Sequence, residues 1–128
     1  MRRLALWLLL LCLAAGHARA AGAQQSFVVF FQQWSAAFDD AALRVIASAA
    51  DWAKSHPGAP ILVVGAADLT GSKQANILLS ELRAQVVTDQ LAADGAEPAR
   101  IKQEGLGSVD YALSSQESRR VVISFPST

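Results

Sequence analysis

Short apolar runs alternate with longer stretches of helical spacing along this chain. Two runs, residues 27–31 (Phe-Val-Val-Phe-Phe) and 60–65 (Pro-Ile-Leu-Val-Val-Gly), are bounded by polar or turn-forming residues. Each is short, continuous and rich in β-branched or aromatic residues, so each predicts a strand buried on both faces. Residues 101–106 and 121–125 predict two further strands, the last with high β-branched content.

The stretch from residue 39 to about residue 55 predicts a first helix. Asp39-Asp40 places acidic residues in its first turn and Lys54 lies in its last, as the helix dipole favours. A core stripe is expected at Leu43, Ile46, Ala47, Ala50 and Ala53, and a second apolar stripe at Val45, Ala49 and Trp52. The second stripe predicts either an exposed patch that binds a partner or a second copy of the chain, or a Trp52 that completes the core by folding over the sheet edge or by packing with Trp34.

Residues 72 to about 94 predict a second helix, with Gly95 as its left-handed cap. Its core stripe is expected at Ala75, Leu78, Leu79, Leu82 and Val86. Three polar residues, Asn76, Ser80 and Arg83, share a strip along the flank of that core face.

The order of these elements is strand, helix, strand, helix, strand, strand, with short connections. It predicts an α/β (α+β) sandwich, in which a mixed βαβαββ sheet carries two main helices on one face. Strands joined through a helix are expected to be parallel, and the last two strands are expected to be joined antiparallel. The sequence shows no repeat and no long linker, so residues 21–128 are predicted to form one domain.

The first twenty residues have the pattern of a signal peptide. Met1-Arg2-Arg3 is basic, residues 4–15 carry no charge, and Ala18-Arg19-Ala20 ends in a small-x-small cleavage pattern. The apolar run is shorter than the roughly 20 residues that span a membrane. We therefore expect export to the periplasm with a mature N-terminus at residue 21. Cys12, the sole cysteine, lies between leucines, which disfavours a lipid anchor.

Charge and residue usage narrow the range of functions. The chain has 11 basic and 11 acidic residues, and removing Arg2, Arg3 and Arg19 with the leader leaves 8 basic against 11 acidic. This balance argues against nucleic-acid binding, which needs a basic face. After the leader, the single histidine, His56, lies in a Pro-Gly turn and no cysteine remains. We therefore expect no metal site, no cofactor and no catalysis.

The chemistry-bearing stretch runs from residue 65 to residue 84. It reads Gly65-x-x-Asp68-x-x-Gly71 and then Asn76-x-x-Leu79-Ser80-x-x-Arg83-Ala84. Ligands commonly sit where a buried strand ends in a loop that leads into a helix. Asp68 and Arg83 could bind a zwitterion, with the ammonium on the carboxylate and the carboxylate on the guanidinium. Alternatively, Asp68 only accepts loop amides or pairs with Arg83.

At these residues the sequence resembles the OmpA-like, or MotB-like, peptidoglycan-binding domain family. That family carries Gly-His-Thr-Asp-x-x-Gly, then Asn-x-x-Leu-Ser-x-x-Arg-Ala on the helix, and Arg-Arg-Val near the last strand. Further matches are Gly105-Leu106-Gly107, Arg119-Arg120-Val121 and Ser35-x-x-Phe38, whereas Ala66-Ala67 stands in place of the His-Thr pair. The resemblance covers most of residues 27–125 and implies the OmpA-like fold.

The resemblance implies non-covalent recognition of the diaminopimelate in the stem peptide of peptidoglycan. In that reading Asp68 takes the ligand's amine, Arg83 takes its carboxylate, Asn76 positions the loop or ligand, and Arg119 closes the site. The protein would then support cell-envelope integrity, peripherally associated with the outer membrane through an envelope membrane protein. The alternative, favoured by Ala66-Ala67, is an OmpA-fold interaction module that has lost wall binding.

Overall fold

A computed structural model of the chain describes residues 25–109 and 118–126. The elements, in chain order, are β1 (Gln25–Phe30), α1 (Asp40–Ser55), β2 (Ile61–Ala67), α2 (Lys73–Ala93), the 3-10 turn η1 (Pro98–Arg100), β3 (Ile101–Ser108) and β4 (Arg120–Phe125). The strands and helices expected from the sequence are all present, with ends within about two residues of the expected positions. The predicted signal peptide and cleavage site lie outside the described residues.

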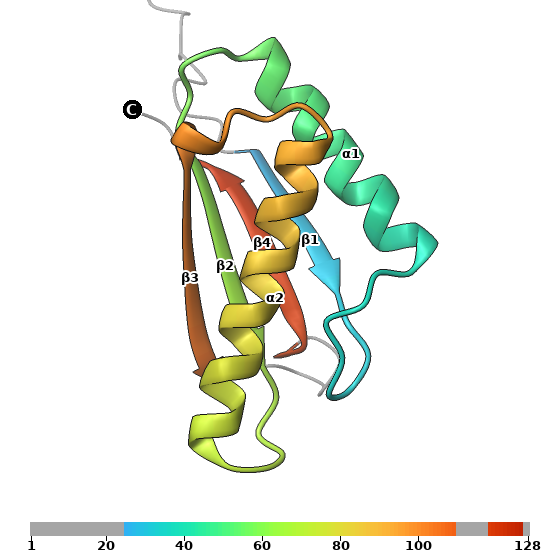
Figure 1. The fold of residues 1–128 in the computed structure, drawn as a ribbon, viewed down its shortest axis with the longest axis vertical. Helices are drawn as coiled ribbons and strands as arrows, with labels where there is room; N and C mark the ends of the chain where they lie inside the picture. Colours follow the sequence, from blue (N-terminus) through green and yellow to red (C-terminus); the bar gives the residue numbers. More distant parts are fainter. Residues whose placement is uncertain (1–24, 110–117, 127–128) are drawn as a thin grey trace, which may run out of the picture.

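The four strands form one mixed sheet in the order β1-β4-β2-β3 (Figure 1). β2 and β3, which are joined through α2, are parallel neighbours as predicted, and β4 is antiparallel to both β1 and β2. The predicted mixed sheet is confirmed. β3 and β4 run in opposite directions as expected but are not neighbours, because β4 inserts between β1 and β2. Its inward side chains Val121, Ile123 and Phe125 are all buried, as this central position requires.

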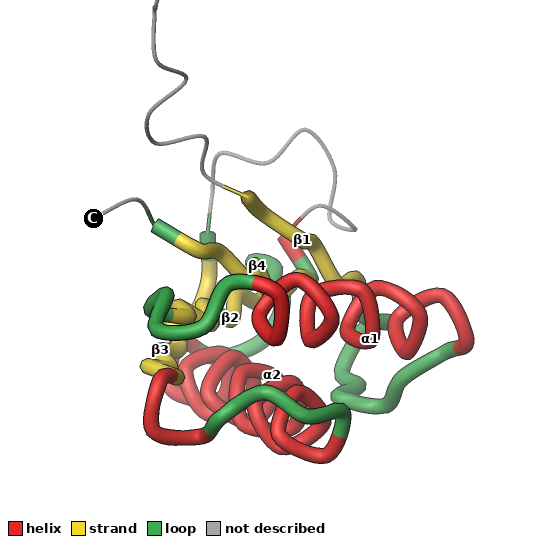
Figure 2. Tube along the Cα trace, turned by 90° about the horizontal axis from the view of Figure 1, so that it is seen from above, coloured by secondary structure: helices red, strands yellow, loops and turns green. Residues whose placement is uncertain are grey.

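Both helices lie on the same face of the sheet, and Figure 2 shows them side by side below it. The prediction that the first two strands are buried on both faces is therefore wrong. In β1, which is an edge strand, Val29 is buried toward the helices, whereas Val28 and Phe30 are exposed. β2 alternates between buried and half-buried residues from Ile61 to Val64 for the same reason, and its last three residues are all buried. One covered face gives alternating burial even along a continuously apolar run.

Helix α1 covers the β1 side of the sheet with small and aliphatic side chains. The Asp39 side chain accepts a hydrogen bond from the Ala42 amide at 2.7 Å and so caps the helix start. The buried face consists of Ala42, Ile46, Ala49, Ala50 and Ala53. Leu43, expected in the core, is exposed, so the predicted stripe is rotated by part of a turn.

The second apolar stripe of α1 completes the core. Ala49 is fully buried, and the Trp52 ring lies 4.4 Å from the Phe125 ring and stacks on His56. Because Trp52 is partly buried against the core cluster, the alternative of an exposed interface at this stripe is wrong. Trp52 completes the core, as the other alternative required, through contact with Phe125 of the central strand β4.

Helix α2 packs on the sheet with a different face from the one predicted. Its buried residues are Asn76, Ser80, Arg83, Ala84, Val87 and Leu91. The predicted core residues Leu78 and Leu82 are instead 59% and 50% exposed. The flanking polar strip of the prediction is therefore the inward face of the first half of the helix.

Two glycines of the sheet explain why α2 buries this face and not the leucine face. Gly65 of β2 and Gly105 of β3 are paired neighbours, and both lie directly under α2. A Cβ on Gly65 would come within 2.1 Å of the Ser80 carbonyl oxygen, and one on Gly105 within 2.5 Å of the Glu81 amide nitrogen. Because the helix backbone approaches so closely at these two glycines, only small side chains such as Ser80 and Ala84 fit between the helix and this part of the sheet. The leucines must point outward.

The ends of α2 follow the predicted signals. The Ser72 side chain accepts a hydrogen bond from the Ala75 amide at 3.1 Å, and Gly95 follows the helix with a φ of 113°. Among the described residues, neither helix is both long enough and apolar enough to cross a membrane.

Candidate functional site

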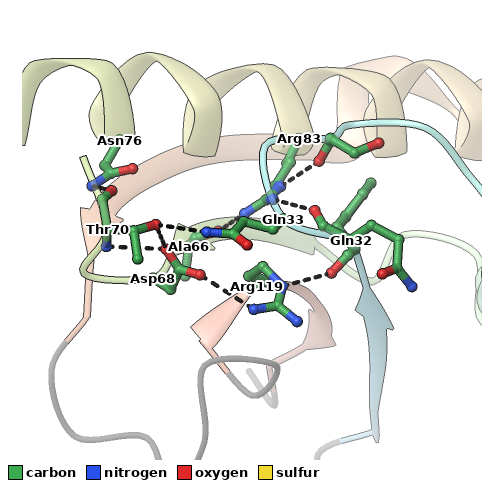
Figure 3. A network of polar contacts seen from close by, with 10 residues as sticks. Gln32, Gln33, Ala66, Asp68, Thr70, Asn76, Arg83 and Arg119 are labelled. Atoms are coloured by element: carbon green, nitrogen blue, oxygen red, sulfur yellow. Dashed lines mark hydrogen bonds and ion pairs between the residues drawn. The ribbon is translucent and has the colours of Figure 1, made fainter. Parts of the chain in front are cut away.

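Three segments distant in sequence meet at one end of the sheet. They are the segment that follows β1, the loop from β2 to α2, and Arg119 immediately before β4. The antiparallel pairing of β1 with β4 brings the end of β1 beside Arg119. Figure 3 shows the polar network that connects the three segments beneath the first turns of α2.

Asp68 is the carboxylate of this network and is only 6% exposed. One carboxylate oxygen accepts hydrogen bonds from the Thr70 amide, at 3.2 Å, and from the Thr70 hydroxyl. The other forms an ion pair with the Arg119 guanidinium at 3.2 Å. Burial alone would raise the pKa of Asp68, but the hydrogen bonds from Thr70 and the hydrogen bond and charge of Arg119 outweigh it and lower that pKa. Asp68 is therefore ionised at neutral pH.

Arg83 is fully buried, with an exposed fraction of 0%. Its guanidinium donates to three backbone carbonyls, those of Ser35 at 2.8 Å, Ala66 at 3.0 Å and Gln32 at 3.0 Å (Figure 3). The guanidinium carbon also lies 5.2 Å from the centre of the Phe31 ring. Burial lowers the pKa of Arg83 to about 10, with Asp68 opposing and Arg119 adding to the effect. The side chain thus keeps its charge at neutral pH.

Arg119 is the more accessible of the two cations. Its side chain is 17% exposed. It donates through Nε to the Phe31 carbonyl at 3.1 Å and through Nη1 to Asp68. The Asp68–Arg119 pair therefore forms the outer part of the network, and Arg83 lies behind it.

Asn76, in the first turn of α2, fixes the loop that carries Asp68. Its amide nitrogen donates to the Thr70 carbonyl and to the Ser108 hydroxyl, both at 2.8 Å. The Ser80 hydroxyl one turn later accepts a hydrogen bond from the Gly107 amide at 2.8 Å. These bonds tie the loop that carries Asp68 to the end of β3.

The four residues singled out in the sequence thus share one network, but the pairing differs from the alternative in which Asp68 binds Arg83. Asp68 forms its ion pair with Arg119 and accepts a loop amide. Arg83 reaches the network through backbone carbonyls. In this geometry it can touch a ligand only if the segment around Gln32 and Ser35 moves aside.

Thr70 was missed by the sequence analysis, although a signal existed. A threonine two residues after an aspartate has the spacing of an Asx turn, in which the side chain accepts the amide two positions on. The hydroxyl of Thr70 adds a second bond to Asp68. By contrast, the carbonyl acceptors of Gln32, Ser35 and Ala66 carry no side-chain signal in the sequence.

The network combines one carboxylate with two guanidinium groups, so its formal charge is +1. Such a site attracts an anionic group while keeping one carboxylate for a cation. Within residues 25–109 and 118–126, no group of three histidine, cysteine, aspartate or glutamate side chains is placed to hold a metal ion.

Known proteins match this chain over most of the described fold. The family model described as the OmpA family matches residues 30–121. The chain is similar to the probable lipoprotein YiaD of Escherichia coli (strain K12), with 31% identity over 101 residues, 74% of this chain and 46% of that protein. It also resembles the peptidoglycan-binding protein ArfA of Mycobacterium tuberculosis (strain ATCC 25618 / H37Rv), with 42% identity over 66 residues, 52% of this chain and 20% of ArfA. The chain therefore spans less than half the length of both relatives.

Solved structures share the fold. The peptidoglycan-associated lipoprotein from Burkholderia pseudomallei superposes with a TM-score of 0.71 at 27% identity, covering 76% of this chain and 87% of that chain. The OmpA-like domain of FopA1 from Francisella tularensis reaches a TM-score of 0.76 at 21% identity, covering 85% and 76% of the two chains.

Proposed function

Because the chain belongs to the OmpA family, we propose that it is a non-catalytic periplasmic module that binds peptidoglycan through the diaminopimelate of the stem peptide. The proposed site consists of Asp68, Asn76, Arg83 and Arg119. Binding would attach the protein to the cell wall and so support the integrity of the envelope. Its contact with the outer membrane would be peripheral, through an envelope membrane protein.

The observation that carries the proposal is the Asp68–Arg119 ion pair at the outer edge of a network backed by a second, buried cation. The side chain of diaminopimelate ends in an ammonium and a carboxylate on one carbon. The ammonium would approach Asp68, and the carboxylate would approach the exposed part of Arg119. Arg83 would then act at short range through its charge. A ligand with paired opposite charges complements this pair without leaving a charge unmatched.

The names of two relatives support the same class of ligand. ArfA is called a peptidoglycan-binding protein, and the structure from Burkholderia pseudomallei is of a peptidoglycan-associated lipoprotein. The substitution of Ala66-Ala67 for the family's His-Thr removes side-chain support from the loop. The Thr70 hydroxyl and the Asn76 amide supply hydrogen bonds to the same loop.

Calorimetric titration with two stem peptides tests the proposal. One peptide carries diaminopimelate at its third position, and the other carries lysine, which has the same ammonium but lacks the carboxylate. We expect the diaminopimelate peptide to bind and the lysine peptide to bind far more weakly. Asp68→Asn and Arg119→Ala should each weaken the first by about 2–5 kcal/mol, because each leaves a ligand charge unpaired. The exposed Lys102→Ala on β3 is the matched control and should bind as the unchanged protein does.

A second candidate function, an envelope interaction module without wall binding, is favoured by the near-complete burial of Asp68 and Arg83. Retention on purified sacculi separates the two. Failure of the unchanged chain to bind either stem peptide, together with equal sacculus retention of Asp68→Asn, would show that the network only supports the loops.

A further inference from the structure

Trp34 has an unusual backbone. Among the described residues it is the one non-glycine residue with a positive φ, at 55°. The Ser35 amide donates to the Gln32 carbonyl at 3.1 Å, so Trp34 occupies the third position of a tight turn, where a positive φ normally calls for glycine or asparagine. A bulky side chain in this region carries conformational strain, and such strain is concentrated at functional sites.

The Trp34 ring is held in a fixed place by the neighbouring loop. It lies against Gly71, where a Cβ would come within 2.3 Å of the ring atom Cη2. The Gln33 side chain donates to the Thr70 hydroxyl at 3.4 Å, and Arg83 holds the carbonyls of both Gln32 and Ser35. Both flanks of the turn are therefore fastened to the loop or to the Arg83 network.

Despite these restraints, Trp34 remains 50% exposed. Gly71, on which its ring rests, lies three residues after Asp68 in the same loop. A rigid, half-exposed aromatic ring thus borders the charged site. The core does not require it, since Trp34 is not among the residues packed in the core cluster.

We propose that Trp34 is a stacking platform for a sugar ring of the glycan strand that bears the stem peptide. This inference rests on the proposed binding of peptidoglycan and extends it from the peptide to the saccharide. The apolar face of a pyranose presents C–H groups that carry partial positive charge, and these pack on the electron-rich face of an aromatic ring. A pre-positioned tryptophan provides this contact area with little loss of side-chain entropy.

Titration with a matched pair of ligands tests the inference. One ligand is the diaminopimelate stem peptide alone, and the other is the same peptide attached to the N-acetylglucosamine–N-acetylmuramic acid disaccharide. For the unchanged full chain, the disaccharide should increase the affinity about tenfold. Trp34→Asn should abolish that increase while leaving binding of the bare peptide within about twofold, since asparagine tolerates a positive φ. Trp34→Phe should retain part of the increase.

Leu69→Ala is the matched control, because Leu69 is an exposed apolar residue of the same loop without an aromatic face. It should keep the full effect of the disaccharide. Equal affinity of the unchanged chain for the two ligands, or an undiminished disaccharide effect in Trp34→Asn, would overturn the inference while leaving peptide recognition intact. Binding of neither ligand would instead refute the proposed function, and the sugar platform with it.

Discussion

The two helices share one face of the sheet but pack on it by different means. Helix α1 buries alanines and Ile46, so its contact is apolar along its length. Helix α2 buries Asn76, Ser80 and Arg83 in its first half and Ala84, Val87 and Leu91 in its second. Its leucines Leu78 and Leu82 lie in solvent instead. The comparison shows that the first half of α2 is positioned by specific hydrogen bonds and close backbone contact, whereas α1 is positioned by hydrophobic burial.

The difference has a consequence for function. An apolar contact tolerates moderate changes in side-chain shape, since volume rather than direction determines its strength. A buried guanidinium with three carbonyl partners tolerates few substitutions, because each buried polar group left without a hydrogen-bond partner carries a desolvation penalty. Two residues of the proposed binding site, Asn76 and Arg83, lie in the half of the second helix that tolerates fewer substitutions.

The largest effect expected is from Arg83→Ala. It leaves the carbonyls of Gln32, Ser35 and Ala66 without their donor, and should lower the free energy of unfolding by about 3–5 kcal/mol in urea titrations. The sequence pattern places Arg83 on the flank of the core stripe, and its complete burial shows that this prediction is wrong.

A pair of conservative changes sharpens the contrast between the helices. Ile46→Val in α1 should cost about 0.5–1.5 kcal/mol. Arg83→Lys keeps the charge but loses the planar fork, and should cost about 2–3 kcal/mol, since at least one carbonyl stays unmatched. Equal losses for the two conservative variants would contradict the view that α2 is held by direction-dependent bonds.

An intermediate effect on stability is expected from low pH. It should act through the Asp68 carboxylate, in the loop that leads into α2. The pKa of Asp68 is lowered in the folded protein, so its ionised form contributes stability above its unfolded value of 3.8. That contribution disappears as the pH falls through the lower, folded value. Asp68→Asn should therefore be less stable than the unchanged chain at pH 7, and in chemical denaturation the gap should close as the pH falls below 3.8 and through the lower, folded pKa. A gap that stays constant between pH 7 and pH 2 would show that the Asp68 charge is irrelevant to stability.

The smallest effect is expected at the outward leucines of α2. Leu82→Gln should change the free energy of unfolding by less than about 0.5 kcal/mol, because half of that side chain is already exposed and glutamine is a good helix former. The matched change Leu91→Gln on the buried side should cost several kcal/mol by comparison. A large loss of stability in Leu82→Gln would instead support the buried face of α2 that the sequence predicts.

The sequence alone determined the elements and their ends. Asp39, Ser72 and Gly95 act locally on the first or last turn of a helix, so their positions indicate the helix boundaries without knowledge of the fold. The motif residues also indicated which end of the sheet carries the polar network. Asp68, Asn76, Arg83 and Arg119 do lie together there, whereas their role in ligand binding remains a proposal.

Only the tertiary structure decided which face of α2 is buried. Its apolar stripe favoured burial of the leucines, because periodicity counts hydrophobic residues on one helix and contains nothing about the surface that receives them. Gly65 and Gly105 bring the helix backbone so close to the sheet that only small side chains fit between them. The carbonyls that receive Arg83 belong to residues 17, 48 and 51 positions away, and they converge only when the chain folds. The buried face of α2 was therefore set by close backbone packing and by long-range hydrogen bonds, neither of which the local sequence of the helix can express.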